Sequence, residues 1–509
     1  MLFRNTSAIT AALVTGYVFS FILAPIMLAR LGLAQFGVWA VTGAFAMYAG
    51  LMDLGIARGL GRFIAFYEAS GNRRAVEQCY TLGLIAVTFV GVVAGTVGYF
   101  AAPAAAGALD DVLTAADMRI VLLSSVSIGV LNAYRSVMRA VPEGMEQFVP
   151  PSVAEIGFNV VNFTLSLIAL ILSRELAVYA LANVAAGVAG LGFAYVALRR
   201  VVGPHRLRLP PKALVKEVTA FSVQNQVSWI ADLSTGQAAK IIIAFFLDVR
   251  LAGAYDLASR AVLAAKSVAV MSVSAMVPTA TARIVREGAG IVGDFYRRYN
   301  TRSMAVSLPL LIFLCVSAPA LLVAWLGDVP ENSLALFVVL TLANCVNLST
   351  GVAYALALGE GRAGMIAGVS AYTAVVTIVL MLALTPVFGV WGTATGSVVG
   401  IVSGALVYLI YFHRAHGIPA RDYVRSVGRP ALTALLPAVP IALSWLVLEA
   451  PDGRPSAAVI SAVDAAVYFG IYLPLADRLD LLPERLRPSH LRRALIARRR
   501  RRSDPVGAA

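Results

Sequence analysis

The chain has 509 residues, of which 59% are hydrophobic and only 13% are charged, and its mean hydropathy is +0.81. Soluble domains average about a quarter charged residues, so this composition excludes a soluble globular protein and indicates an integral membrane protein. The formal net charge of +14 raises the question of a nucleic-acid partner. The basic residues lie mainly in short loops and in the C-terminal tail, as the positive-inside rule predicts, so we expect no nucleic-acid partner.

Apolar runs of about 20 residues recur along almost the whole chain, which is the length that a helix needs to cross a hydrocarbon core of about 30 Å. We therefore predict an all-α polytopic membrane protein. The fourteen predicted transmembrane helices lie at 8–29, 37–59, 79–101, 118–140, 152–172, 176–198, 219–247, 252–276, 303–326, 334–358, 363–385, 389–412, 430–449 and 457–477.

The loops between these helices differ in charge on the two sides of the membrane. With a cytoplasmic N-terminus, the inner connections hold most of the basic residues, in the ranges 58–74, 135–139, 199–216, 283–302 and 414–429. The outer connections hold few basic residues and several acidic ones, such as Asp110, Asp111 and Asp452. This asymmetry predicts that both chain termini lie in the cytoplasm.

A weak internal repeat relates the two halves of the chain. Residues 246–266 follow residues 30–50 by about 216 positions, and each segment has a short polar turn, a glycine at the helix start and an aromatic residue soon after. The two segments read RLGLAQFGVWAVTGAFAMYAG and FLDVRLAGAYDLASRAVLAAK. An even number of helices per repeat keeps the orientation of the second half, so we expect two pseudo-symmetric six-helix lobes with the substrate site between them.

The predicted division of the chain follows from this repeat. It consists of an N-lobe with helices 1–6 (1–198), a basic cytoplasmic linker (199–218), a C-lobe with helices 7–12 (219–412), helices 13 and 14 (413–478) and a basic cytoplasmic tail (479–509).

Ionisable residues inside apolar helices mark the candidate site, because such residues usually face a water-filled cavity or a partner. The stretch 221–266 carries five of them, and the N-lobe adds others near the ends of its first two helices. The basic ones exceed the nearby carboxylates, and a surplus of positive charge in a low dielectric suits an anion such as a diphosphate. The candidate substrate-binding residues are Arg30, Arg58, Lys240, Arg260 and Lys266, and the candidate coupling or ion-pair residues are Asp53, Asp232 and Asp256.

The alternative interpretation is that these charges only neutralise one another. Asp256 and Arg260 are spaced i,i+4 on a helix and can pair, and Asp232 can pair with a basic neighbour.

Motifs for catalysis are missing from the sequence. It contains no G-x-S-x-G, no G-x-x-x-x-G-K-[ST] and no H-E-x-x-H. The three cysteines, Cys79, Cys315 and Cys345, lack metal-ligand spacing. We therefore expect no enzymatic activity, no metal and no cofactor.

Several segments resemble a known family. Residues 30–72 contain FG-x-W and DLG (Asp53, Leu54, Gly55), and are similar to the first hairpin of polysaccharide-type (Wzx-like) flippases of the multidrug/oligosaccharidyl-lipid/polysaccharide (MOP) exporter superfamily. The segment LDVRLAGAYDLASR resembles the second-half turn of these proteins, and GVWGTATGSVVG (389–400) resembles their glycine-rich twelfth helix.

The resemblance implies two six-helix lobes that open alternately to either side of a bacterial inner membrane. It implies a polyprenyl-diphosphate-linked glycan as cargo, moved from the inner to the outer leaflet for O-antigen, capsule or exopolysaccharide biosynthesis. Membrane lipid, a glycan polymerase and glycosyltransferases are the implied partners. The residue pattern of the lipid II flippase branch is not matched position by position.

Two other functions compete with the flippase. A proton- or sodium-coupled drug or metabolite antiporter of the same superfamily would use Asp53, Asp232 or Asp256 for cations. A membrane-embedded glycan polymerase or ligase would need an outer catalytic loop, for which the short outer connections leave no room.

Overall fold

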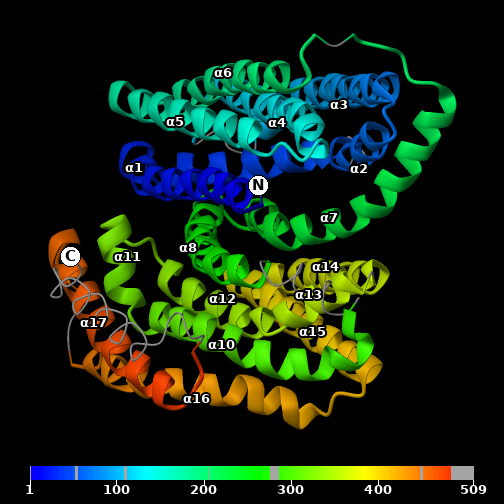
Figure 1. Ribbon diagram of the computed structural model, residues 1–509. Coiled ribbons are helices and arrows are strands. Elements are labelled where there is room, and N and C mark those ends of the chain that lie inside the picture. Colours follow the sequence, from blue (N-terminus) through cyan, green and yellow to red (C-terminus); the bar gives the residue numbers. More distant parts are fainter. Residues whose placement is uncertain are drawn as a thin grey trace, which may run out of the picture. The chain divides into compact units, whose positions relative to one another are not determined.

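The computed structural model describes residues 2–51, 56–107, 112–204, 206–274, 286–360, 362–447 and 451–482, and within these ranges every regular element is a helix (Figure 1). The helices are α1 (Leu2–Leu51), α2 (Ile56–Ala69), α3 (Arg73–Gly107), α4 (Ala115–Gly144), α5 (Val149–Leu172), α6 (Leu176–Val202), α7 (Lys212–Phe246), α8 (Val249–Ser274), η1 (Ala289–Ile291), α10 (Val292–Val316), α11 (Ala318–Leu326), α12 (Ser333–Leu348), α13 (Gly351–Gly359), α14 (Ala363–Phe388), α15 (Val390–His416), α16 (Ala420–Ser444) and α17 (Arg454–Arg478).

Eleven of the described helical segments are long and apolar enough to cross a membrane. One of them, in α1, covers the first predicted span and most of the second, and α7 and α8 coincide with two more. Within the described residues, each of the fourteen predicted spans therefore falls mainly on helix, and the all-α polytopic fold class is confirmed.

Gly32 separates the two spans within α1. Its φ of 78° and ψ of 168° are not helical, so the helix changes direction there. Residues other than glycine rarely adopt a positive φ, which explains why a glycine occupies the joint.

Several helices begin well before the predicted spans. α10 begins at Val292 rather than 303, and α16 begins at Ala420 rather than 430. Hydropathy detects only the part of a helix that lies in hydrocarbon, whereas backbone hydrogen bonding continues into the basic interfacial turns. For the same reason α2, an amphipathic helix in a stretch interpreted as a basic loop, was not predicted.

The chain divides into two compact units. Unit 1 comprises Met1–Leu257 and Ile378–Thr395, and unit 2 comprises Ala258–Thr377 and Gly396–Ala509. The two units are defined by contacts within the chain. The lobe boundaries expected from the internal repeat stay predictions.

In unit 1, α4 packs between α3 and α6, and α5 packs against α6 and α1 (Figure 1). A core of buried side chains from α2, α3 and α4 includes Leu60, Ile64, Cys79 and Val137. In the basic linker, Arg208 Nε lies 2.7 Å from Glu77 Oε2, and the Arg208 amide donates to Thr81 Oγ1 at 3.0 Å. These contacts attach the linker just before α7 to the first turns of α3.

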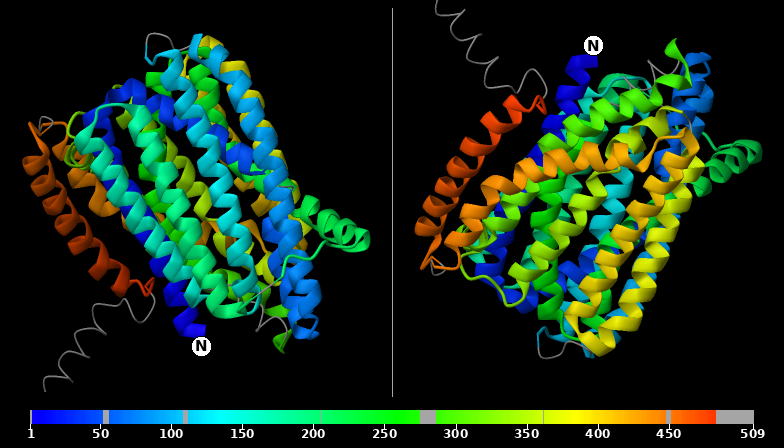
Figure 2. Two further views of the ribbon diagram at one scale, coloured as in Figure 1. Left: turned by 90° about the horizontal axis from the view of Figure 1, so that it is seen from above. Right: turned by 90° about the horizontal axis from the view of Figure 1, so that it is seen from below.

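In unit 2, α10 packs along α16, and α17 packs against α11 and α16 (Figures 1 and 2). Their shared core contains Phe313, Tyr468 and Tyr472, and both tyrosine hydroxyls donate to backbone carbonyls, of Ala434 and Ala305 respectively. α16 and α17, which coincide with predicted helices 13 and 14, therefore share a buried core with α10.

Candidate functional site

The two segments aligned by the internal repeat touch in unit 1. A methyl group on Gly37 would lie 2.0 Å from the carbonyl oxygen of Val249, and one on Gly253 would lie 3.1 Å from the Cα of Gly37. Only glycine permits such close backbone contact, as is common between membrane helices. Gly37 and Gly253 are 216 positions apart (253 − 37), which is the spacing of the repeat.

Lys240 of α7 forms a buried ion pair with Asp256 of α8. Lys240 Nζ lies 2.5 Å from Asp256 Oδ1 and donates to Gln237 Oε1 at 2.8 Å, and the two charged side chains are only 10% and 2% exposed. A buried ion pair must satisfy both charges, because each would be costly to bury alone. Asp256 therefore pairs with Lys240 on the neighbouring helix. The i,i+4 spacing had suggested Arg260 on the same helix as its partner.

The remaining candidate residues fall in both units. Arg30 is exposed, near the end of the first span of α1 in unit 1. In unit 2, Arg260 is half-buried on α8, and Lys266 Nζ donates to Asn347 Oδ1 of α12 at 2.8 Å. Lys266 therefore has a polar, neutral hydrogen-bond acceptor on α12.

Three other candidates cannot be placed in the site. Arg58 belongs to α2 and Asp232 to α7, but their side chains lie outside the described residues, as does the whole of Asp53. The shared cationic cavity stays a prediction.

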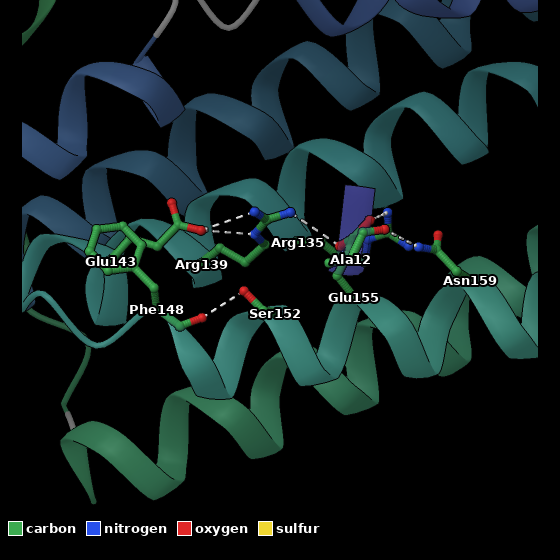
Figure 3. A network of polar contacts seen from close by, with 8 residues as sticks. All are labelled: Ala12, Arg135, Arg139, Glu143, Phe148, Ser152, Glu155 and Asn159. Carbon is green, nitrogen blue, oxygen red and sulfur yellow. Dashed lines mark hydrogen bonds and ion pairs between the residues drawn. The ribbon is translucent and has the colours of Figure 1, made fainter. Parts of the chain in front are cut away.

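A second cluster of charges, absent from the predicted site, lies inside unit 1 (Figure 3). We call it the Arg135 cluster, and it consists of Arg135, Arg139, Glu143 and Glu155. Arg139 Nη1 lies 3.2 Å from Glu155 Oε2, and its Nη2 lies 3.0 Å from Glu143 Oε1. Arg135 Nη2 lies 3.4 Å from Glu155 Oε1. Glu155 on α5 therefore bridges two arginines on α4.

Arg135 is the most enclosed member, with a side chain that is 9% exposed. Its guanidinium carbon lies 3.3 Å from the centroid of the Phe158 ring, a cation–π contact. A methyl group on Gly190 of α6 would lie 2.9 Å from Arg135 Nη1, so glycine makes room for the guanidinium. Arg135 Nε and Nη1 have no hydrogen-bond partner among the described residues, so two donors remain that can bind an anionic oxygen or water.

The sequence contains a signal for this cluster. Arg135 and Arg139 were assigned to an inner connection, whereas both lie on α4. Residues 135, 139 and 143 recur every four positions, which places one line of charges on one helix face. Only Glu155, from another helix, required the tertiary structure.

No group of His, Cys, Asp and Glu side chains that could hold a metal occurs in the ranges that the structure describes.

The chain matches the profile of a family described as "Polysaccharide biosynthesis protein" over residues 2–283. No curated protein matches it by sequence.

Several solved structures share the fold. A structure described as "Lipid II flippase MurJ, inward closed conformation" has a TM-score of 0.71 and 11% sequence identity, covering 92% of this chain and 98% of that one. A multidrug resistance MATE transporter of the MOP superfamily, in an inward-facing conformation, has a TM-score of 0.64 and 14% identity, with coverage of 78% and 94%. A MOP superfamily transporter from Pyrococcus furiosus, described as having a binding pocket of reversed polarity, has a TM-score of 0.55 and 15% identity, with coverage of 81% and 96%.

Proposed function

The chain belongs to the polysaccharide biosynthesis protein family, and from this premise we propose that it is a flippase for a polyprenyl-diphosphate-linked glycan. The family match is the observation that carries the proposal. A polysaccharide assembled on a lipid carrier must cross the membrane before it reaches the cell surface, and this chain is a multi-pass membrane protein. The neighbours named above are transporters and flippases rather than enzymes.

In this proposal the protein lies in a bacterial inner membrane with both termini in the cytoplasm. Glycosyltransferases would supply the lipid-linked glycan at the inner leaflet, and a polymerase would use it at the outer leaflet. The fold shared with MurJ, which is described as a lipid II flippase, supports a lipid-linked substrate. O-antigen and exopolysaccharide units are the proposed glycan class.

The predicted basic residues Arg30, Arg58, Lys240, Arg260 and Lys266 would hold the diphosphate or acidic sugars. The buried partner of Lys240 adds a step to this idea, because a diphosphate must compete with the Asp256 carboxylate for the ammonium group. Substrate entry would then release the Lys240–Asp256 bond between α7 and α8, which would link binding to helix movement.

The membrane potential can drive such export. Two negative charges that move outward across an inside-negative membrane gain about 2.3 kcal/mol per charge per 100 mV if they cross the full field. The flippase proposal therefore needs no nucleotide-binding motif.

A transport assay in proteoliposomes tests the proposal with the variant Lys240→Ala, Arg260→Ala. We expect transport of a polyprenyl-diphosphate glycan to fall about tenfold or more, because a hydrogen bond to a charged group contributes about 1.5–3 kcal/mol. The matched control is Lys212→Ala, Arg250→Ala, which removes two exposed basic residues from α7 and α8. Wild-type transport by the test variant, at equal protein level, would contradict the anion site.

A further variant separates loss of binding from loss of stability. Lys240→Ala leaves the Asp256 carboxylate buried without this partner, which destabilises the protein by itself. Adding Asp256→Asn removes the unpaired charge. Recovery of the folded protein without recovery of transport is the result that we expect.

One observation favours a cation antiporter as the second candidate. The Lys240–Asp256 pair cancels part of the positive surplus, and multidrug transporters share the fold. This function predicts saturable binding of an organic cation that depends on pH or sodium and is lost in Asp232→Asn. Absence of such binding, together with glycan transport, would exclude it.

A further inference from the structure

Asp464 is a buried carboxyl group in the middle of an apolar helix. α17 has 25 residues, from Arg454 to Arg478, and is long and apolar enough to cross a membrane. At 1.5 Å per residue, Asp464 lies about 15 Å from the start of α17 and about 21 Å from its end. The residue is only 8% exposed. A carboxyl group at this depth needs a partner or a proton.

Two buried serines belong to the same part of unit 2 as this carboxyl group. Ser461 lies three residues earlier on the same helix face, and Ser317, at the junction of α10 and α11, is the polar neighbour of the carboxyl group. They are 9% and 0% exposed. Asp464 Oδ2 and both serine Oγ atoms have no hydrogen-bond partner among the described residues. These three buried polar groups could therefore satisfy one another by hydrogen bonding.

The elements packed against α17 supply no compensating positive charge near Asp464. These elements are α10, α11 and α16. Residues 303–326 and 430–444 contain no Asp, Glu, Lys, Arg or His, and Asp464 is the single such residue in 455–476. The charged residues of these helices lie toward their ends, namely Asp294, Arg297, Arg298, Arg302, Arg421, Asp422, Arg425, Arg429, Arg454, Asp477 and Arg478.

Two other hydrogen-bond donors on α17 already have backbone carbonyls as partners. Tyr468, one turn after Asp464, donates its hydroxyl to the Ala434 carbonyl at 2.9 Å. Arg454, at the start of α17, donates to the Leu326 carbonyl at 2.7 Å. The hydroxyls of Ser317 and Ser461, which have no hydrogen-bond partner among the described residues, remain able to interact with the carboxyl group.

We propose that Asp464, with Ser317 and Ser461, forms a proton-binding site that couples transport to the proton gradient. A protonated carboxyl group has one O–H donor, which a serine oxygen can accept, and the serine hydroxyls can donate to the carboxyl oxygens. The three groups then satisfy one another without a charge. A hard metal cation needs a larger shell of oxygen ligands than these residues offer.

Release of the proton leaves a carboxylate among apolar side chains of α11 and α17, a state that is unfavourable unless the helices move and admit water. Protonation therefore biases the packing of α17 against α11, and a proton gradient can drive the cycle. The site does not depend on which molecule is transported.

Infrared difference spectroscopy of the full-length protein in proteoliposomes tests proton binding directly. We expect a band from a protonated carboxyl group that disappears in Asp464→Asn and persists in Asp452→Asn, the matched change at an exposed residue just before α17. Ser317→Ala keeps the carboxyl group and removes its neighbour, so the band should move to higher frequency. This second variant keeps the test valid if Asp464→Asn folds poorly.

Three results would overturn the proposal. They are a band unchanged in Asp464→Asn, the absence of a protonated-carboxyl band at every pH from about 5 to about 9, and a band removed by sodium chloride at constant pH. The last result would identify a sodium site.

Transport measurements then test coupling. An imposed pH gradient should change the initial rate of the wild-type protein and of Asp452→Asn, and this response should be lost in Asp464→Asn. A protein that binds the proton but transports no lipid-linked glycan would refute the proposed substrate and leave the proton site standing. An equal response in all three proteins would refute the coupling.

Discussion

The Arg135 cluster of unit 1 and Asp464 of unit 2 both hold buried ionisable side chains, but they differ in whether the charge has a partner of opposite sign. In the cluster two arginines share Glu155, so each charge has an opposite charge within 3.4 Å. Asp464 Oδ2, in contrast, has no hydrogen-bond partner among the described residues. A paired buried charge holds helices together, whereas an unpaired carboxyl group can become neutral by taking a proton. Burial alone therefore does not decide whether a charged residue is structural or titrates.

The largest expected effect comes from breaking the paired region. Glu155→Leu should lower the free energy of unfolding by about 3 kcal/mol or more, because it leaves the buried Arg135 guanidinium without its counter-charge. Thermal unfolding of the purified protein measures this. The double change Arg135→Met, Glu155→Leu should recover most of the loss. A single variant as stable as wild type would show that the ion pair does not hold α4 and α5 together.

Close packing without charge should give an intermediate effect. Gly37→Ala forces a methyl group to within 2.0 Å of the Val249 carbonyl oxygen, and we expect a loss of about 1–3 kcal/mol from overpacking. Gly43 on the same helix has no atom within 4 Å of an added methyl group. Gly43→Ala should therefore be neutral or stabilising by about 0.5–1 kcal/mol. Equal stability of the two variants would mean that α1 and α8 separate readily.

The smallest effect on stability is expected at Asp464. Asp464→Asn should change the free energy of unfolding by less than about 1 kcal/mol, because the amide keeps the shape and no buried partner charge is left behind. The same thermal unfolding assay applies, with Asp452→Asn as control. A loss as large as that of Glu155→Leu would remove the contrast between the two regions and indicate a partner for Asp464.

Much of the fold could be predicted from hydropathy and charge. In the described residues each of the fourteen predicted spans falls mainly on helix, because an apolar run of this length has few alternatives in lipid. The beginnings of α10 and α16 and most of α2 could not be predicted, since these segments are amphipathic and polar. The resemblance to a polysaccharide-type family, stated from FG-x-W and DLG, is confirmed by the match to the polysaccharide biosynthesis protein family.

The candidate site was harder to predict than the fold. The pattern on α7 and α8 selected Lys240 and Asp256, but the i,i+4 spacing suggested Arg260 as the partner of Asp256, and the structure adds Lys240. Asp464 was not among the predicted site residues. A sequence orders residues along one helix, whereas the partner of a buried charge comes from whichever helix packs beside it.

By itself, the sequence determined which segments are helical membrane spans, the charge asymmetry of their loops, and the glycines at repeat-related positions 37 and 253. These properties depend on local composition and spacing. Only the tertiary structure decided that these glycines touch, that Glu155 bridges Arg135 and Arg139, and that Asp464 meets Ser317. These outcomes depend on contacts between residues distant in sequence, because the free energy of a buried charge is decided by its neighbours in space.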